Sequence, residues 1–297
     1  MNRVAERLCV IGVGLIGGSA ALALKAGDRV GEVVGCGRSR DNLDVALARG
    51  IIDRAEQDVA SAVRGADMVL VCTPVGAMEA VLRQVLPAAA PQAVITDAGS
   101  VKQAVITQAR RAAGGTLPPR FVPGHPIAGN ENSGAAAADA ALYRGRRVLL
   151  TPEPATAQDA LARVRALWEA CGAQVVEMEA TTHDRFLGLT SHLPHLAAFA
   201  LMNTLAASPD AENLFQFAAG GLRDTTRVAA SDPVMWRDIF LANREPLLAA
   251  SAGLRAALTE LETAVQASDG AALERAITCA RDLRRRFQQR LDAAAGD

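Results

Sequence analysis

Histidine is the residue type in this chain whose placement most suggests chemistry. All four histidines fall between positions 125 and 195, and they are His125, His183, His192 and His195. An imidazole titrates near neutral pH, so it is the side chain most often used as a general acid or base. Clustering of all four near the middle of 297 residues predicts a polar site where two domains would meet.

His125 has the sequence context of a catalytic group. It lies in Gly124-His125-Pro126-Ile127-Ala128-Gly129, directly after a predicted strand. A side chain at that place reaches the crevice at the carboxyl end of a parallel sheet. A loop histidine between glycine and proline has little packing to do, so we predict an acid or base. The alternative is a structural histidine.

His192 and His195 are three residues apart, which places them on one face of a helix that Pro194 would start. Such a pair could bind zinc, but the only nearby carboxylate is Asp184 and no cysteine is close in sequence. We therefore predict substrate-binding or orienting roles and no metal. The alternative is that the histidines cap or fill a helix interface.

A short polar stretch, Gly220-Gly221-Leu222-Arg223-Asp224-Thr225-Thr226-Arg227, interrupts the otherwise apolar second half. A guanidinium can bind a carboxylate through two parallel hydrogen bonds. Arg227 is therefore a candidate for binding a substrate carboxylate, against the alternative of a solvated helix face.

A glycine-rich loop follows the first predicted strand, in Val10-Ile11-Gly12-Val13-Gly14-Leu15-Ile16-Gly17-Gly18-Ser19. In the Gly-x-Gly-x-x-Gly pattern, Gly12 permits a tight turn, Gly14 lets the backbone approach a pyrophosphate, and Gly17 lets helix and strand pack closely. The pattern predicts a dinucleotide site. We also assign to the cofactor Leu15 and Ile16 in the loop, Thr73 and Pro74 after the strand ending at Cys72, and Asp97 after the strand ending at Thr96.

The end of the second predicted strand indicates which nicotinamide cofactor is preferred. NAD-binding proteins usually carry an acid there for the ribose 2′-hydroxyl. This chain has Arg38, Ser39 and Arg40 instead, whose guanidinium and hydroxyl groups suit a 2′-phosphate. NADP is therefore favoured, and NAD is the alternative. The arginines could also be unrelated surface charges.

The elements that must position these residues change character along the chain. Short β-branched runs alternate with helical patterns up to about residue 177, which predicts a parallel sheet with crossover helices. The predicted strands are Leu8–Ile11, Val30–Cys36, Met68–Cys72, Ala93–Thr96, Arg120–Val122, Arg147–Leu150 and Gln174–Glu177, and the predicted helices are Gly17–Lys25, Arg40–Arg49, Gly76–Leu86, Val101–Ala113 and Thr156–Ala170. Strand signals then end. The prediction is an α/β doubly wound domain over residues 1–179 followed by an all-α domain over residues 180–297.

Composition excludes several functional classes. Lys and Arg total 31 against 32 for Asp and Glu, so there is no basic excess to bind nucleic acid. No stretch reaches about 20 apolar residues without charge, which argues against a membrane span. The five cysteines are odd in number and widely spaced, which is typical of reduced thiols in a cytoplasmic protein. We expect a cytoplasmic protein with a small-molecule substrate, and a homodimer built through apolar helix faces.

Five motifs, in this order, resemble the prephenate and arogenate dehydrogenases of tyrosine biosynthesis. They are Gly12–Ser19, Asp97-Ala98-Gly99-Ser100-Val101-Lys102, His125–Gly129, Ser191-His192-Leu193-Pro194-His195 and Asp224-Thr225-Thr226-Arg227, continued by Ser231–Trp236. The glycine loop is shared by many oxidoreductases, whereas the histidine-proline and Asp-Thr-Thr-Arg motifs are specific. The resemblance implies a Rossmann-like domain, a helical dimerisation domain, and oxidative decarboxylation of a cyclohexadiene to an aromatic product.

The resemblance also implies roles for single residues. His125 corresponds to the histidine that takes the proton of the ring 4-hydroxyl as hydride leaves. Ser100 corresponds to the serine that hydrogen-bonds the same hydroxyl and helps hold that histidine. Arg227 corresponds to the arginine that anchors the ring carboxylate, and His195 to a histidine at the other end of the substrate. The remaining substrate-site candidates are His192, Asp184, Asp224 and Trp236.

The segment after Gly129 departs from the family pattern. It reads Asn130-Glu131-Asn132-Ser133-Gly134, where relatives often have Thr-Glu-Lys-Ser-Gly. Without the lysine, Glu131 is freer to meet an ammonium, so Asn130 and Glu131 favour arogenate or dual use. The main rival is a β-hydroxyacid dehydrogenase or imine reductase, which typically relies on a lysine in the helical domain. The only lysines here are Lys25 and Lys102. A dinucleotide-sensing regulatory protein is the non-enzymatic alternative.

Overall fold

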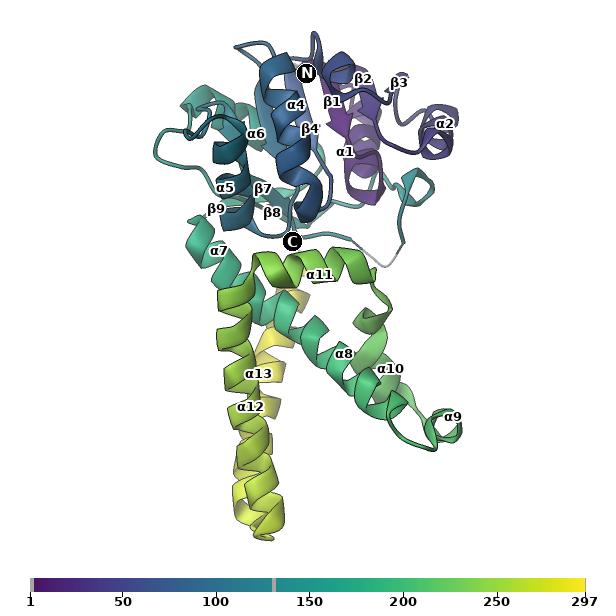
Figure 1. The fold of residues 1–297 in the computed structure, drawn as a ribbon. Coiled ribbons are helices and arrows are strands. Elements are labelled where there is room, and N and C mark those ends of the chain that lie inside the picture. Colours follow the sequence, from purple (N-terminus) through teal and green to yellow (C-terminus); the bar gives the residue numbers. More distant parts are fainter. Residues whose placement is uncertain (1–2, 130–131, 297) are drawn as a thin grey trace. The chain divides into compact units, whose positions relative to one another are not determined.

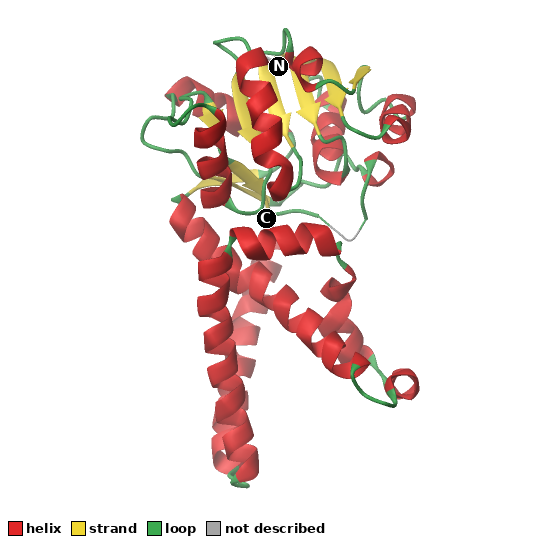
Figure 2. Cartoon of the chain, viewed as in Figure 1, coloured by secondary structure: helices red, strands yellow, loops and turns green. Residues whose placement is uncertain are grey.

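The computed structural model describes residues 3–129 and 132–296, and Figures 1 and 2 show their helices and strands. The chain forms two compact units, Met1–Arg244 and Glu245–Asp297. The predicted division into domains at residues 179 and 180 stays a prediction. The last described strand ends at Glu177, and the regular elements after it are helices, as the sequence predicts.

A six-stranded parallel sheet is the centre of the larger unit, with strand order β3-β2-β1-β4-β5-β6. The order reverses between β1 and β4, and ligands of doubly wound sheets bind at the carboxyl ends of the strands beside such a reversal. The predicted fold class is confirmed. The strands are β1 (Ala5–Ile11), β2 (Val30–Cys36), β3 (Arg54–Glu56), β4 (Met68–Val71), β5 (Val94–Asp97) and β6 (Phe121–Val122).

Helices cover both faces of this sheet because alternate side chains of a buried strand point to opposite sides. In β1, Leu8 and Val10 belong to the apolar cluster under α1 (Leu15–Ala26) and α6 (Gln158–Ala170). Cys9 and Ile11 belong to the cluster under α4 (Met78–Ala88) and α5 (Lys102–Ala112). The predicted helices of this half are present, with α2 (Arg40–Ala48) and the short α3 (Val59–Val63) completing the set.

A second, three-stranded sheet carries His125. It consists of β7 (Gly124–Pro126), β8 (Arg147–Leu150) and β9 (Gln174–Glu177), with β7 antiparallel and β9 parallel to β8. The prediction of a loop around His125 was wrong, because His125 is the central residue of β7 and pairs with Leu149. Pairing with β8 therefore holds the backbone of His125 more firmly than a loop would.

The polar segments of the second half lie on helices. The helices within the larger unit are α7 (Ala180–Leu187), α8 (Leu193–Ala206), α9 (Ala211–Leu214), α10 (Gly220–Thr226) and α11 (Pro233–Ala242). A π-helical turn, Gly188–His192, joins α7 to α8 without a break. Pro194 lies at the start of α8 as predicted, and because proline has no amide to donate, a widened turn just before it is a common solution.

The smaller unit consists of most of α12 (Arg244–Gln266) and of α13 (Gly270–Gly296), joined by a turn in which Ser268 has a φ of 55°. Large apolar side chains on both helices are exposed to solvent in the single chain; they include Leu258, Val265, Ile277, Leu283 and Phe287. None of the described helices combines the length and the apolar run that crossing a membrane would take.

Candidate active site

The glycine loop has the geometry that the sequence predicts. Gly12 has a φ of +92°, and a Cβ there would lie 2.6 Å from the carbonyl oxygen of Cys72. A Cβ on Gly17 would lie 2.5 Å from the Gly12 oxygen and 2.7 Å from Val10 Cγ1, so helix α1 and strand β1 could not pack as they do. A Cβ on Gly14 would meet nothing within 4 Å. The open side of the loop at the start of α1 is therefore where a phosphate could approach the backbone.

Of the three polar residues after β2, one remains uncommitted. Ser39 caps α2 by accepting a hydrogen bond from the Asn42 amide at 3.2 Å. Arg40 forms an exposed ion pair of 2.9 Å with Asp44. The Arg38 side chain is exposed and has no ion-pair or hydrogen-bond partner among residues 3–129 and 132–296. Of these three residues, Arg38 is therefore the one whose side chain is uncommitted.

The other cofactor candidates divide into two kinds. Leu15 and Ile16 form the first turn of α1, and Thr73 and Pro74 follow β4 across the strand-order reversal. The Thr73 hydroxyl is buried without a hydrogen-bond partner, which is costly unless a ligand completes it. Asp97 is different. Its side chain has no exposed surface, and its assignment to the cofactor stays a prediction.

Asp97 and Lys102 form a fully buried ion pair that holds the residue before His125. The Asp97 Oδ2 to Lys102 Nζ distance is 2.5 Å. Lys102 Nζ also donates to the Gly124 carbonyl oxygen at 2.5 Å, and Asp97 Oδ1 accepts from the Gly124 amide at 3.1 Å. The backbone amide and the backbone carbonyl of Gly124 are thus both hydrogen-bonded to this ion pair. Burial lowers the pKa of Lys102, and Asp97 opposes that change.

His125 lies at the end of a chain of buried polar groups. Its Nδ1 is 2.8 Å from His183 Nε2, and His183 Nδ1 is 2.7 Å from Asp184 Oδ1. His183 and Asp184 are on α7 and are buried, whereas His125 is partly exposed. Burial, with the nearby His183, Lys102 and His192, holds the pKa of His125 well below its usual range. At neutral pH His125 is therefore an uncharged base.

Ser100 does not hold His125 in this structure. The Ser100 hydroxyl forms no hydrogen bond to any described residue, and the partner of the imidazole is His183. Ser100 lies in a bend between β5 and α5, two residues from Lys102. Its hydroxyl is consequently free to bind a ligand.

A second group of predicted residues gathers around Trp236 of α11. His195 stacks on the Trp236 ring at a centroid distance of 3.5 Å and an interplanar angle of 21°. His192 meets the same ring edge-on at 6.0 Å, so the two histidines do share one helix face. His195 Nδ1 donates to the Ser191 carbonyl oxygen at 2.9 Å, which leaves Nε2 as its acceptor.

Arg227 and Asp224 lie near this group but have different surroundings. Arg227 is exposed at the start of the turn Arg227–Ala230, and its charge contributes to lowering the pKa of His195, although burial is the larger cause. Asp224 is exposed and forms an ion pair of 3.1 Å with Arg223. Arg227 is thus the cation next to His195. Asn130 and Glu131, the predicted side-chain selectors, lie outside the described residues.

Asn243 joins the two groups of histidines. Its Nδ2 is 2.9 Å from the Asp184 carbonyl oxygen and 2.8 Å from His192 Nδ1. Sequence reasoning assigned no role to His183, Lys102 or Asn243. The sequence offered two signals, the adjacent His183 and Asp184 and the lone Lys102 three residues before the apolar pair Val105-Ile106 of α5. Nothing near Asn243 in the sequence marked it.

His192 makes folding stability depend on pH. Burial lowers its pKa from 6.5 to about 4. Between these values the unfolded chain binds a proton that the folded chain does not, so stability is complete above pH 6.5 and falls as the pH falls. The variant His192→Asn keeps an acceptor for Asn243. Between pH 7.5 and pH 5, we expect its free energy of unfolding to fall by about 2 kcal/mol less than that of the wild type. Urea unfolding at both pH values measures this, and equal losses would contradict it.

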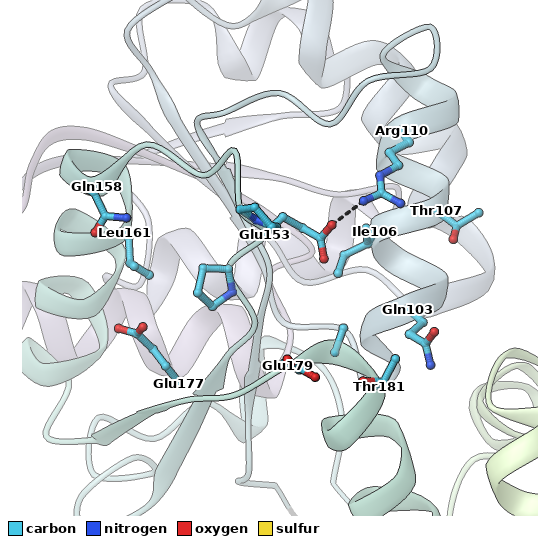
Figure 3. A pocket seen from close by; sticks show the side chains of 13 residues that line it. Gln103, Ile106, Thr107, Arg110, Glu153, Gln158, Leu161, Glu177, Glu179 and Thr181 are labelled. Carbon is cyan, nitrogen blue, oxygen red and sulfur yellow. Dashed lines mark hydrogen bonds and ion pairs between the residues drawn. The ribbon is translucent and has the colours of Figure 1, made fainter.

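A separate cavity of about 550 Å³ lies between α5, the β8–α6 connection and the start of α7 (Figure 3). Arg110 and Glu153 form an ion pair there, and Glu177 and Glu179 also line it. None of the residues predicted to act on substrate or cofactor lines this cavity. The residues around His125 and Trp236 therefore remain the candidate site, and no group of three or more metal-ligating side chains occurs among the described residues.

Comparison with known proteins agrees with this geometry. The family model "Prephenate dehydrogenase, nucleotide-binding domain" matches residues 20–177, and "Prephenate dehydrogenase, dimerization domain" matches residues 179–278. A cyclohexadienyl dehydrogenase of Zymomonas mobilis is 39% identical over 90% of this chain and 91% of its own length. A prephenate dehydrogenase of Bacillus subtilis is 35% identical over 96% of this chain and 76% of its own length.

Solved structures give the same result. The prephenate dehydrogenase from A. aeolicus, in complex with hydroxyphenyl propionate and NAD+, has a TM-score of 0.88 and 33% identity, covering 95% of this chain and 98% of that chain. Synechocystis arogenate dehydrogenase has a TM-score of 0.79 and 28% identity, covering 95% and 99%. Family models cover most of the sequence, and the proteins from Zymomonas mobilis, Bacillus subtilis and A. aeolicus each exceed 30% identity over most of both chains. This chain therefore belongs to the prephenate dehydrogenase family.

Proposed function

We propose that this protein catalyses the oxidative decarboxylation of prephenate, arogenate or both, with hydride transfer to a nicotinamide cofactor. The products are 4-hydroxyphenylpyruvate and tyrosine, respectively. Family membership supports the reaction class. The observation that carries the proposal is His125, an uncharged and partly exposed imidazole next to the carboxyl edge of the parallel sheet.

The residues at the strand-order reversal fit a dinucleotide. The open face of Gly14 and the amides at the start of α1 suit the pyrophosphate, and the unpartnered Thr73 hydroxyl beside Gly12 suits a polar group of the cofactor. When bound, the nicotinamide supplies a hydride acceptor. The protein must then supply a base, hold the ring and keep it oriented.

His125 is the proposed base. Removal of hydride from the carbinol carbon leaves positive charge that is relieved when the hydroxyl loses its proton. His125 Nε2 accepts that proton, which is worth on the order of 10²- to 10⁴-fold in rate. Ser100 has an uncommitted hydroxyl that can bond the same oxygen. Loss of CO₂ from the ring then gives the aromatic product, so Arg227 and His195 need only bind and orient the substrate.

NADP is the cofactor we expect to be preferred, with NAD as the alternative. We expect Arg38→Ala to raise the KM for NADP by about tenfold and to leave the KM for NAD within about twofold, because only NADP carries the 2′-phosphate. Arg40→Ala is the matched control, since Arg40 is already paired with Asp44. Initial rates at fixed substrate measure both constants. An equal effect of Arg38→Ala on the two cofactors would contradict the assignment.

We further propose a homodimer that associates through the second, helical part of the chain. Residues 179–278 match a family model described as a dimerization domain, and large apolar side chains of α12 and α13 are exposed in the single chain. The division of labour would follow the predicted domains, with cofactor binding in residues 1–179 and association in residues 180–297. Light scattering at micromolar concentration tests the dimer, and a monomeric mass would contradict it.

The test of the reaction is a rate measurement with four combinations of reagents. Formation of reduced nicotinamide is followed by absorbance with prephenate or arogenate, each with NAD or NADP. We expect activity in at least one combination and the higher rate with NADP. Absence of activity in all four, with cofactor binding intact, would favour a hydroxyacid dehydrogenase. Against that rival, Lys102 is fully buried and bound to Asp97, and Lys25 is paired with Asp53.

A further inference from the structure

His183 and Asp184 leave only one arrangement of protons along the chain that ends at His125. The Asp184 carboxylate is buried and accepts the Lys102 amide at 2.8 Å and the Gln103 amide at 3.0 Å, both at the start of α5. Each of the two carboxylate oxygens accepts a backbone amide, and a carboxylate can only accept hydrogen bonds. His183 Nδ1, 2.7 Å from Asp184 Oδ1, must therefore carry a proton.

The same reasoning passes from His183 to His125. Burial, with the charge of Lys102, lowers the pKa of His183, so this imidazole is neutral and its second nitrogen is unprotonated. His183 Nε2 then accepts a hydrogen bond, and its partner at 2.8 Å is His125 Nδ1. His125 Nδ1 must carry the proton. The nitrogen left with a lone pair is His125 Nε2, on the opposite side of the ring.

We infer that His183 and Asp184 are positioning residues that hold His125 in the tautomer whose Nε2 can accept the substrate proton. The inference rests on the proposed function of His125. In the other tautomer Nε2 carries a proton, and the ring cannot act as the base.

The hydrogen-bonded chain from Asp184 through His183 to His125, here called the relay, also has a role after proton transfer. The hydroxyl O–H bond breaks, the new N–H bond forms at His125 Nε2, and the hydride leaves with its electron pair for the nicotinamide. His125 is then an imidazolium that still donates from Nδ1 to His183. The negative charge that balances it is Asp184, reached through one neutral imidazole, so no second proton transfer is required.

Nitrogen NMR of the wild-type holoprotein tests the tautomer directly. With only four histidines, protein labelled with ¹⁵N-histidine gives a spectrum that single-histidine variants can assign. We expect His125 and His183 each to carry the proton on Nδ1 and to have an unprotonated Nε2. A protonated Nε2 on His125 at neutral pH would overturn the inference. This readout does not require any substrate to be turned over.

Two substitutions separate positioning from packing. His183→Phe keeps the ring but removes both hydrogen bonds, and we expect kcat to fall on the order of 100-fold while the KM values stay within about threefold. His183→Gln offers an amide oxygen near the former Nε2, so we expect kcat within about tenfold of the wild type and the Nδ1 proton of His125 restored. Wild-type kcat in His183→Phe would overturn the inference.

The outcomes distinguish this inference from the proposed function. If His125→Asn abolishes turnover but His125 carries its proton on Nε2 in the wild type, the reaction assignment stands and the relay fails. If no substrate is turned over but the expected tautomers are found, the relay stands and the reaction assignment fails. Should His183→Phe not fold, the wild-type spectrum and His183→Gln still decide.

Discussion

His125→Asn is expected to lower kcat on the order of 10²- to 10⁴-fold while leaving the KM for substrate and the affinity for cofactor nearly unchanged. Asparagine can still donate to His183 Nε2 from its amide, so the local hydrogen bond and the fold are kept. What it lacks is a basic nitrogen at the position of Nε2, and the loss of a general base appears in kcat. Steady-state rates with both substrates measure the effect.

The pH dependence of the wild type provides an independent check of the same base. The pKa of His125 is held well below 6.5, mainly by burial, so the imidazole stays neutral as the pH falls through 6.5. We expect kcat/KM to be maintained through this range and to fall only at more acidic pH, in a limb that His125→Asn lacks. A kcat of His125→Asn within threefold of the wild type, with cofactor binding intact, would remove His125 as the base.

Arg227→Gln is expected to raise the KM for substrate by on the order of 10- to 100-fold with a smaller change in kcat. A paired guanidinium and carboxylate contribute about 1.5 to 3 kcal/mol, and glutamine keeps the length of the side chain without the charge. Because prephenate and arogenate share the ring carboxylate, the increase should be similar for both. Initial-rate measurements over a range of each substrate determine it.

The matched control is Arg223→Gln, four residues earlier in the same segment. Arg223 is exposed and already paired with Asp224, so the KM values of Arg223→Gln for substrate should stay within about twofold of the wild type. Equal effects of the two substitutions would indicate a general electrostatic attraction instead of a specific contact. An increase for only one substrate would place Arg227 at the side-chain end of the ligand.

The parts of the fold that the sequence predicted are those governed by local pattern. The β-branched runs of β1, β2 and β4 and the three loop glycines had clear signals, because one strand buried on both faces needs apolar residues throughout. Strand β3 has only three residues, Arg-Ala-Glu, with no apolar period to detect. Strand β7 reads Gly-His-Pro, which is a poor strand sequence, and it is a strand only because β8 pairs with it.

The candidate site shows the same division. Histidines and an arginine in polar segments could be recognised as chemical groups from their types and neighbours alone. Their partners come from the tertiary fold, because His125 and His183 are 58 positions apart and Lys102 and Asp184 are 82 apart. Asp97 illustrates the same limit. Its place after a strand suggested a cofactor contact, which stays a prediction, and its burial against Lys102 and Gly124 could not be read from the sequence.

The enclosure of Lys102 has a practical consequence for chemical labelling. The chain has two lysines, and Lys25 has a partly exposed side chain whereas Lys102 has none. An amine-directed acylating reagent can therefore react with Lys25 in the folded protein. It can react with Lys102 only when α5 separates from β5 and β7 and exposes that side chain. The rate of acylation at Lys102 would therefore report how often the segment behind His125 opens locally, and the rate at Lys25 would serve as the internal reference.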